Sequence, residues 1–397
     1  MAKLQRHYAT PTLLAAGLAL AGMATAPLHA QDDPIEIGNI TSLTGTNAVQ
    51  GTDIQQGIAL AVKRVNEGYE VPTMDDRSME IGPGLLDGRA LKVNVEDTES
   101  RPQSAMDAVR KLVNTDDVEV VLGEYSSGIT LPTAKFSDEN GVVQIGIGST
   151  SPQLAEVGPY YFSAIGTDVL MGQALAEFAH EDAGVDAFTS ITPNNPFGIG
   201  LERQACRQLE ELGSQCTQTS RYELEQNDYT PIIRSTVRDD SEVGFFTAYG
   251  TEARLILRQM HEMGVDVDWY AGYPTMWSQE ISEMPVVGEG IKGLRPGPST
   301  DDDFVQDEYA AGYEALHGEE PPTAFGAYAY DAAMLVALAI EEAGSTDADA
   351  VRDALPSVAE VYQGVTGGKA FDDNGMQVEE TYREVIYTDG ELQSYNR

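Results

Sequence analysis

The feature that most constrains the fold is a unit that recurs along the chain: a short apolar strand, a loop of small or hydroxyl side chains, and an amphipathic helix. The first unit has its strand at residues 35–40, and the helix after it carries apolar residues from Ile54 to Val65 at helical spacing. Two further units begin with strands at 118–122 and 142–147. Strands that alternate with helices in this way predict an α/β fold with parallel sheets.

The loops after the second and third strands suggest a site for a small polar ligand. In parallel sheets, ligands collect outside the carboxyl ends of the strands, where helix N-termini offer unpaired N–H groups. Helix capping is an alternative role for the two serines of the first loop, and capping and binding can coexist. The candidate ligand-binding residues in the two loops are Ser126, Ser127, Gly148, Ser149 and Thr150, with Glu124 and Tyr125 as further possibilities.

The second half of the chain has strands of its own at 187–191, 243–247 and 269–272, and the loops that follow them are aromatic. Any single aromatic residue there can be explained by core packing or by turn chemistry. Aromatic residues on successive strand ends instead indicate a shared surface. A hydroxyl-lined lobe that faces an aromatic-lined lobe would clamp an amphiphilic small molecule. The candidate residues of the second lobe are Phe197, Tyr249, Tyr273 and Trp277, and Phe325 is a further possibility.

Residues 1–30 read as a secretory signal peptide. Lys3 and Arg6 precede an apolar stretch at 13–23, and small residues lead to a cleavage site after Ala30. A membrane span is the alternative, but the apolar stretch is shorter than the roughly 20 residues that a bilayer requires. No cysteine lies near the cleavage site, so we expect a mature protein without a lipid anchor or a membrane-embedded segment.

The charge is strongly negative, with 24 Lys and Arg against 64 Asp and Glu and a net charge of -40. Both nucleic acids and anionic membrane surfaces require basic patches, so this composition argues against either partner. An acidic surface is expected in a salt-rich habitat, where counter-ions screen the self-repulsion. Cation binding is a sharper alternative for the acidic runs 301–303 and 372–375, but neither has the spacing of a calcium loop, so we predict no metal. A helix cap at Asp303 and a hairpin turn at 373–375 explain them.

Only two cysteines are present, Cys206 and Cys216. In an oxidising compartment they can close a short loop as a disulfide, which is the interpretation that we prefer to two free thiols. A metal pair is disfavoured because there is no Cys-x-x-Cys motif and no histidine nearby.

An enzyme is also disfavoured. The histidines beyond the signal peptide, His180, His261 and His317, are widely spaced, so no His-centred triad is visible. The chain has no Gly-x-Ser-x-Gly elbow, no Walker-type phosphate loop and no His-Glu-x-x-His motif. We therefore predict no catalytic residues and no cofactor.

A series of short segments in a fixed order extends over nearly the whole mature chain. They are residues 37–45, 50–66, 97–113, 121–132, 145–154, 197–200, 229–232, 324–332, 362–367 and 371–375. In order and spacing these segments resemble the periplasmic substrate-binding proteins of ABC transporters, in the branch of the leucine/isoleucine/valine-binding proteins.

The resemblance implies the type I periplasmic binding fold, in which two Rossmann-like lobes are joined by three hinge crossovers. By analogy the crossovers are expected near 163–166, 293–298 and 371–378. The first lobe would comprise 31–165 and 295–372, and the second 166–294 and 373–397. It also implies a periplasmic protein that captures a small molecule and delivers it to permease subunits.

The resemblance assigns roles to the candidate site. The loops that hold Ser126–Ser127 and 148–150 would bind the carboxylate and the amino group of a ligand, most simply a branched-chain or other hydrophobic amino acid. Two departures leave other ligands open: Gln50 stands where the leucine-binding pattern has an aromatic residue, and the loop 273–275 lacks the acidic residue that often pairs with the ligand ammonium. Either another carboxylate such as Glu124 serves, or the ligand is urea, a short amide or an aromatic carboxylate. A sensory protein that signals through a receptor is a further alternative.

Overall fold

The computed structural model describes residues 33–395 except 75–77, 278–280, 282–283 and 297–303. The predicted signal peptide and the predicted cap at Asp303 therefore lie outside the described residues. The side chain of Trp277 is likewise not described.

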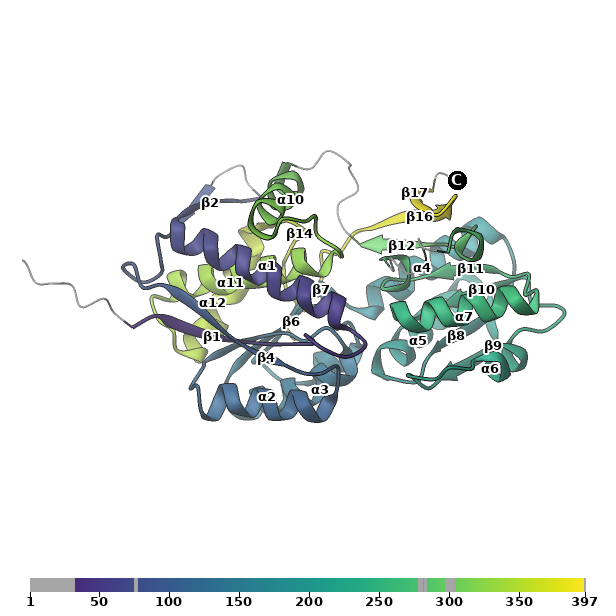
Figure 1. Cartoon of the computed structure of the whole chain (residues 1–397), viewed down its shortest axis with the longest axis horizontal. Coiled ribbons are helices and arrows are strands. Elements are labelled where there is room, and N and C mark those ends of the chain that lie inside the picture. The colour runs from purple at the N-terminus through teal and green to yellow at the C-terminus, as the bar shows by residue number, and fades with distance from the viewer. Residues whose placement is uncertain (1–32, 75–77, 278–280, 282–283, 297–303, 396–397) are drawn as a thin grey trace, which may run out of the picture. The chain divides into compact units, whose positions relative to one another are not determined.

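The first lobe is built on a six-stranded sheet in the order β15-β7-β6-β5-β1-β4, with every neighbouring pair parallel (Figure 1). Its strands are β1 (Ile35–Thr41), β4 (Leu91–Asp97), β5 (Val120–Leu122), β6 (Val143–Gly146), β7 (Tyr161–Gly166) and β15 (Met376–Gln377). Two small hairpins pair β2 (Tyr69–Pro72) with β3 (Ser78–Ile81) and β13 (Gln363–Gly364) with β14 (Gly367–Gly368).

The helices of the first lobe are α1 (Ala48–Glu67), α2 (Pro102–Asn114), α3 (Ser127–Glu139), the 3-10 turn η1 (Pro152–Glu156), α10 (Phe304–His317), α11 (Phe325–Ala343) and α12 (Ala348–Val361). Helix α11 is buried at every residue from Phe325 to Ile340, a largely apolar stretch that also contains Asp331. It packs closely on α1, where a Cβ atom on Gly57 would lie 1.9 Å from the carbonyl oxygen of Gly326. This contact admits only glycine.

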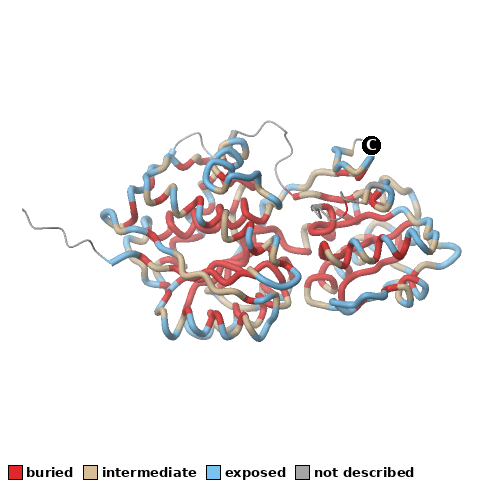
Figure 2. Tube along the Cα trace, viewed as in Figure 1, coloured by how far each residue is buried: buried red, intermediate tan, exposed pale blue. Residues whose placement is uncertain are grey.

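The second lobe is built on a seven-stranded sheet in the order β17-β16-β12-β11-β10-β8-β9. Strands β8 (Ala187–Pro193), β9 (Gln215–Tyr222), β10 (Val243–Phe246), β11 (Asp268–Ala271) and β12 (Lys292–Pro296) are parallel, whereas β16 (Tyr382–Thr388) and β17 (Glu391–Ser394) are antiparallel. The helical elements are α4 (Asp168–Ala183), α5 (Pro196–Leu212), α6 (Thr230–Thr236), α7 (Gly250–Met263), η2 (Thr275–Trp277) and α9 (Pro285–Gly288). Figure 2 shows that burial follows the central strands and the inner helices.

This architecture confirms the predicted α/β fold with two parallel-stranded lobes. The chain leaves the first sheet after Gly166, enters α4 and continues into the second sheet. It returns after β12 and crosses again at 378–381, between β15 and β16. The first crossover was expected near 163–166, but these residues belong to β7. The third was expected near 371–378, but Met376 and Gln377 in that range pair with β7 in the first sheet. The residue boundaries of the lobes otherwise stay a prediction.

Two local predictions concern the cysteines and the turn at 372–375. Cys206 of α5 and Cys216 of β9 form a disulfide. In the turn, the Asp372 carboxylate accepts the backbone N–H of Asn374 at 2.8 Å, and Gly375 has a positive φ of 75°. Within the described ranges, no helix is long and apolar enough to cross a membrane. The same ranges contain no group of three His, Cys, Asp or Glu side chains that could hold a metal.

Candidate ligand-binding site

Several helices begin at the carboxyl ends of strands and bring the candidate residues together. Ser127 opens α3 after β5, and Asp168 opens α4 after β7. In the second lobe, Phe197 lies in the first turn of α5 and Tyr249 caps α7. Phe325 is the first residue of α11. Helix N-termini carry unpaired N–H groups and a partial positive charge, so this end of each lobe is suited to an anionic ligand group.

Five aromatic rings from both lobes meet at this place. Tyr125 packs edge-on against Phe325 at 4.7 Å between ring centroids and against Tyr249 at 5.9 Å. The ring of Tyr249 also lies 5.6 Å from that of Phe197, and the ring of Tyr273 lies 6.2 Å from that of Phe325. Aromatic pairs of this kind contribute about 0.5–1.5 kcal/mol each beyond their buried area.

The rings enclose a cavity of about 10 Å³. This is room for about one water molecule, so a ligand must displace rings or separate the lobes to enter. Gly148 allows the arrangement, because a Cβ atom there would lie 2.5 Å from Cδ2 of Tyr125. The residues that line the cavity are Tyr125, Ser127, Gly148, Phe197, Tyr249, Tyr273 and Pro274.

The hydroxyl of Ser127 joins the two loops of the first lobe. Its Oγ accepts the backbone N–H groups of Thr150 at 3.1 Å and of Ser151 at 3.2 Å. Because both of these contacts use Oγ as an acceptor, the hydroxyl hydrogen stays available for donation to a ligand.

Two other predicted residues face inward and have structural partners. The Ser149 hydroxyl is fully buried and donates to the carbonyl oxygen of Glu124 at 2.9 Å. The Glu124 carboxylate is also fully buried: Oε1 accepts the hydroxyls of Ser42 and Thr98, and Oε2 accepts the N–H of Ser126 at 2.8 Å. Glu124 therefore orders the loop before α3, and its oxygens are already engaged. Gln50 is half-buried in α1 and is not a lining residue of the cavity.

Thr150 and Asp168 present unpaired acceptors beside the aromatic rings. Thr150 is 1% exposed and Asp168 is 0% exposed. Among the described residues, neither Oγ1 of Thr150 nor either carboxylate oxygen of Asp168 has a hydrogen-bond partner of good geometry. The two residues are held together by the backbone, because the N–H of Asp168 donates to the carbonyl oxygen of Thr150 at 2.8 Å.

The electrostatics of the site centre on Asp168. Burial raises the pKa of Asp168 well above its usual value, and the nearby Thr150 hydroxyl only partly opposes that rise. Burial also raises the pKa of Tyr249 to about 12 and that of Tyr273 further, and the charge of Asp168 adds to both shifts. A buried carboxyl group without a cationic partner is costly when ionised, so the site is incomplete without a positive group.

Sequence reasoning missed Asp168. The available signal was its place directly after the apolar strand at 161–166, where a parallel sheet binds ligands. Its burial arises from tertiary packing: a Cβ atom on Gly200 of α5 would lie 2.8 Å from Oδ2 of Asp168. Pro274 was also missed as a lining residue.

Two α/β lobes that share a small cavity with aromatic walls are typical of a two-lobed binding protein for small molecules. Residues 34–390 match the family model described as periplasmic binding protein, and the chain belongs to that family. This is a family of solute-binding proteins, and it implies an extracytoplasmic location.

Relatives of known name agree with this assignment. The chain is 27% identical over 365 residues to "Leu/Ile/Val-binding protein homolog 1" of Brucella abortus (strain 2308), which covers 91% of this chain and 92% of the relative. The fold of the present chain is similar to that of the leucine binding protein LivK from Thermotoga maritima. The TM-score is 0.80 and the identity 22%, and the match covers 91% of this chain and 98% of LivK. The Streptococcus pneumoniae branched-chain amino acid transporter substrate binding protein LivJ, in complex with isoleucine, has a TM-score of 0.79, 22% identity and the same coverage.

Proposed function

We propose that the protein binds a small α-amino acid with an apolar side chain between its lobes and delivers it to the permease of an ABC transporter. The observation that carries this proposal is the buried carboxyl group of Asp168, whose oxygens have no cationic partner and no hydrogen bond of good geometry among the described residues. The names of the relatives, which refer to leucine, isoleucine and valine, support the same ligand class.

The ammonium group of the ligand would lie against Asp168 and Thr150. A primary ammonium has three N–H donors and no acceptor, which matches a site with two carboxylate oxygens and one hydroxyl oxygen. A urea, a neutral amide or an aromatic carboxylate carries no positive charge, so it would gain nothing from ionisation of Asp168. On this proposal, the counter-charge that the loop 273–275 lacks would come from the start of α4 instead.

The carboxylate of the ligand would lie at the N-terminus of α3. Ser127 lines the cavity and retains a hydroxyl hydrogen, and the first turn of α3 adds backbone N–H groups and the favourable end of the helix dipole. Among the described residues, no basic side chain lines this cavity, so backbone and hydroxyl donors would supply the whole recognition of the anion.

The side chain of the ligand would pack against the aromatic rings. The lining residues include three aromatic rings from the second lobe, Phe197, Tyr249 and Tyr273, and one from the first, Tyr125. An apolar side chain gains from the burial of its own surface at about 25 cal/mol per Å². Contact with both lobes would favour the closed form, which a permease can distinguish from the empty protein.

A thermal-shift screen of the secreted protein in high salt tests the ligand class. The ligands are L-leucine, L-isoleucine, L-valine and L-phenylalanine, with urea, acetamide and benzoate as comparators. A ligand at a hundred times its Kd adds about 2.7 kcal/mol of stability. We expect a raised melting temperature with at least one amino acid and none with the comparators. A shift with benzoate, urea or acetamide and none with the amino acids would overturn the proposal.

The transport role needs a separate test, because a sensory protein would bind the same ligand. Deletion of the gene should abolish uptake of the radiolabelled ligand by the cells at low concentration. Unchanged uptake would favour signalling through a receptor.

A further inference from the structure

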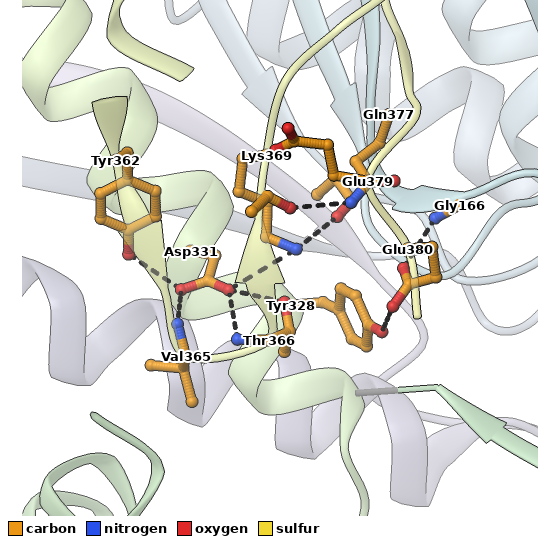
Figure 3. Close-up of polar contacts among 12 residues, drawn as sticks. Gly166, Tyr328, Asp331, Tyr362, Val365, Thr366, Lys369, Gln377, Glu379 and Glu380 are labelled. Atoms are coloured by element: carbon orange, nitrogen blue, oxygen red, sulfur yellow. Dashed lines mark hydrogen bonds and ion pairs between the residues drawn. The ribbon is translucent and has the colours of Figure 1, made fainter. Parts of the chain in front are cut away.

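One carboxylate connects two of the crossovers between the lobes. Glu380 lies in the third crossover, between β15 of the first sheet and β16 of the second. Its Oε2 accepts the backbone N–H of Gly166 at 2.9 Å, and Gly166 ends β7 at the first crossover (Figure 3). Its Oε1 accepts the hydroxyl of Tyr328 from α11 at 2.8 Å.

The position opposite Glu380 has room only for glycine. A Cβ atom on Gly166 would lie 2.5 Å from Cβ of Glu380 and 3.1 Å from the hydroxyl oxygen of Tyr382. The two crossover strands therefore approach each other more closely than any other residue at 166 would allow. The hydrogen bond to Gly166 is formed at the point where this approach is closest.

Buried charges support Glu380 from the side of the first lobe. Lys369 is fully buried, and its Nζ donates to the carbonyl oxygen of Ala164 at 3.2 Å and lies 3.8 Å from Oδ2 of Asp331. The Lys369 ammonium also lies 4.8 Å from the ring centroid of Tyr328, the residue that bonds Glu380. Figure 3 shows that Lys369 lies between Asp331 and the crossover segment that carries Glu380. Asp331 in turn accepts the hydroxyl of Tyr362 at 2.8 Å, so this support is anchored in the core of the first lobe.

The first crossover leads directly to the candidate ligand site. Asp168 follows Gly166 by two residues, and its N–H is bonded to the carbonyl oxygen of Thr150 at 2.8 Å. The segment 166–168 is thus fixed at one end by Glu380 and at the other by the loop that carries Thr150.

We infer that Glu380 is a positioning residue for ligand binding: its carboxylate clamps the first and third crossovers together and thereby holds Asp168 in place to receive the ligand cation. The part that concerns the ligand rests on the proposed function. The clamp itself rests on the contacts of Glu380 alone. Hinge rotation that separates the two crossovers must break the hydrogen bond to Gly166, so the two crossovers move together.

The test compares E380A, E380Q and the control E379A, whose residue is exposed and next in sequence. Calorimetry with L-leucine at 25 °C gives the affinity, and hydrogen–deuterium exchange of the empty protein follows the peptide 161–169. E380A is expected to weaken L-leucine binding about tenfold and to speed exchange in that peptide. E380Q keeps an acceptor for the N–H of Gly166, so its L-leucine affinity and its exchange rate should lie within threefold of wild type. E379A should match wild type in both measurements.

Several results would overturn the inference. Wild-type affinity and exchange in E380A would do so, as would an E380Q variant that is as impaired as E380A. If E380A does not fold, G166A provides the test. The added Cβ atom would push the two crossover segments apart without changing any charge. Wild-type affinity and wild-type exchange in G166A would contradict the clamp. If L-leucine does not bind the wild-type protein, the proposed function fails, while the exchange measurement still decides the clamp.

Discussion

The behaviour of the candidate site depends most on Asp168. Its raised pKa means that the empty site favours the protonated carboxyl group, whereas a ligand ammonium favours the carboxylate. Between the pKa of the empty site and the lower pKa of the occupied one, binding must release a proton. The affinity for L-leucine should therefore rise with pH and level off above the pKa of the empty site.

Calorimetry in two buffers of different ionisation enthalpy measures this proton release. D168N should abolish it and weaken binding by about 3–5 kcal/mol, which is the cost of removing one partner of a buried ion pair. The same carboxyl group destabilises the empty protein as pH rises from 3.8 through its raised pKa, so D168N should increase the melting temperature at neutral pH. Binding without proton release at any pH would contradict this account.

Thr150 and Ser127 should respond differently to truncation. Oγ1 of Thr150 has no hydrogen bond of good geometry among the described residues, so T150A should cost about 1.5–3 kcal/mol of binding and lower the melting temperature less than S127A does. S127A also leaves two backbone N–H groups without their acceptor and should lower both affinity and stability. Calorimetry and thermal unfolding of both variants check this. Wild-type affinity in T150A would remove Thr150 from the site.

Sequence reasoning located some candidate residues through their place at a strand end, and their role in binding stays a prediction. The loops with Ser127 and Gly148 were predicted to form the site, and both residues line the cavity. It could not tell that Ser149 and Glu124 turn inward, because the direction of a side chain in a loop depends on the hydroxyls and N–H groups that surround it after folding. The same limit applies to Asp168, which is buried by α5, a helix that begins 28 residues further along the chain.

At the level of elements, hydrophobic periodicity predicted the helix that follows β1, and short apolar runs predicted the central strands, because these segments bury apolar residues in the core. It did not predict β15, which has only two residues and exists because it pairs with β7. The third crossover is displaced toward 378–381 for this reason. The role of Glu380 was also missed, because its hydrogen bond to Gly166 joins residues that are 214 positions apart in the sequence.

The disulfide stabilises α5 against β9. It closes a loop with a sequence separation of 10, for which loop-closure entropy gives about 2–3 kcal/mol of stability. The double variant C206S/C216S should lose about that amount in chemical denaturation. The affinity of the variant for L-leucine should stay within twofold of wild type. The candidate binding residue Phe197 lies in the first turn of α5, whereas Cys206 lies in its second half. Equal stability of the variant and the oxidised wild type would contradict a structural role for the bond.

At the scale of the whole molecule, the net charge of -40 determines how stability depends on salt. The Debye length increases from about 3 Å at 1 M to about 30 Å at 0.01 M ionic strength. Repulsion between carboxylates grows over this range, so the melting temperature should fall as sodium chloride is removed. Differential scanning calorimetry from 1 M to 0.01 M sodium chloride measures it. Melting that is independent of salt would reject adaptation to a salt-rich habitat.

The most direct test of the account is whether the site recognises both charged groups of an amino acid at once. Calorimetry at neutral pH and high salt compares L-leucine with leucinamide, which lacks the carboxylate, and with 4-methylpentanoate, which lacks the ammonium. We predict that L-leucine binds and that each analogue binds at least about a hundredfold more weakly, because each leaves one end of the site without its partner. If 4-methylpentanoate bound as tightly as L-leucine, Asp168 would not be the partner of an ammonium group, and the central claim would be contradicted.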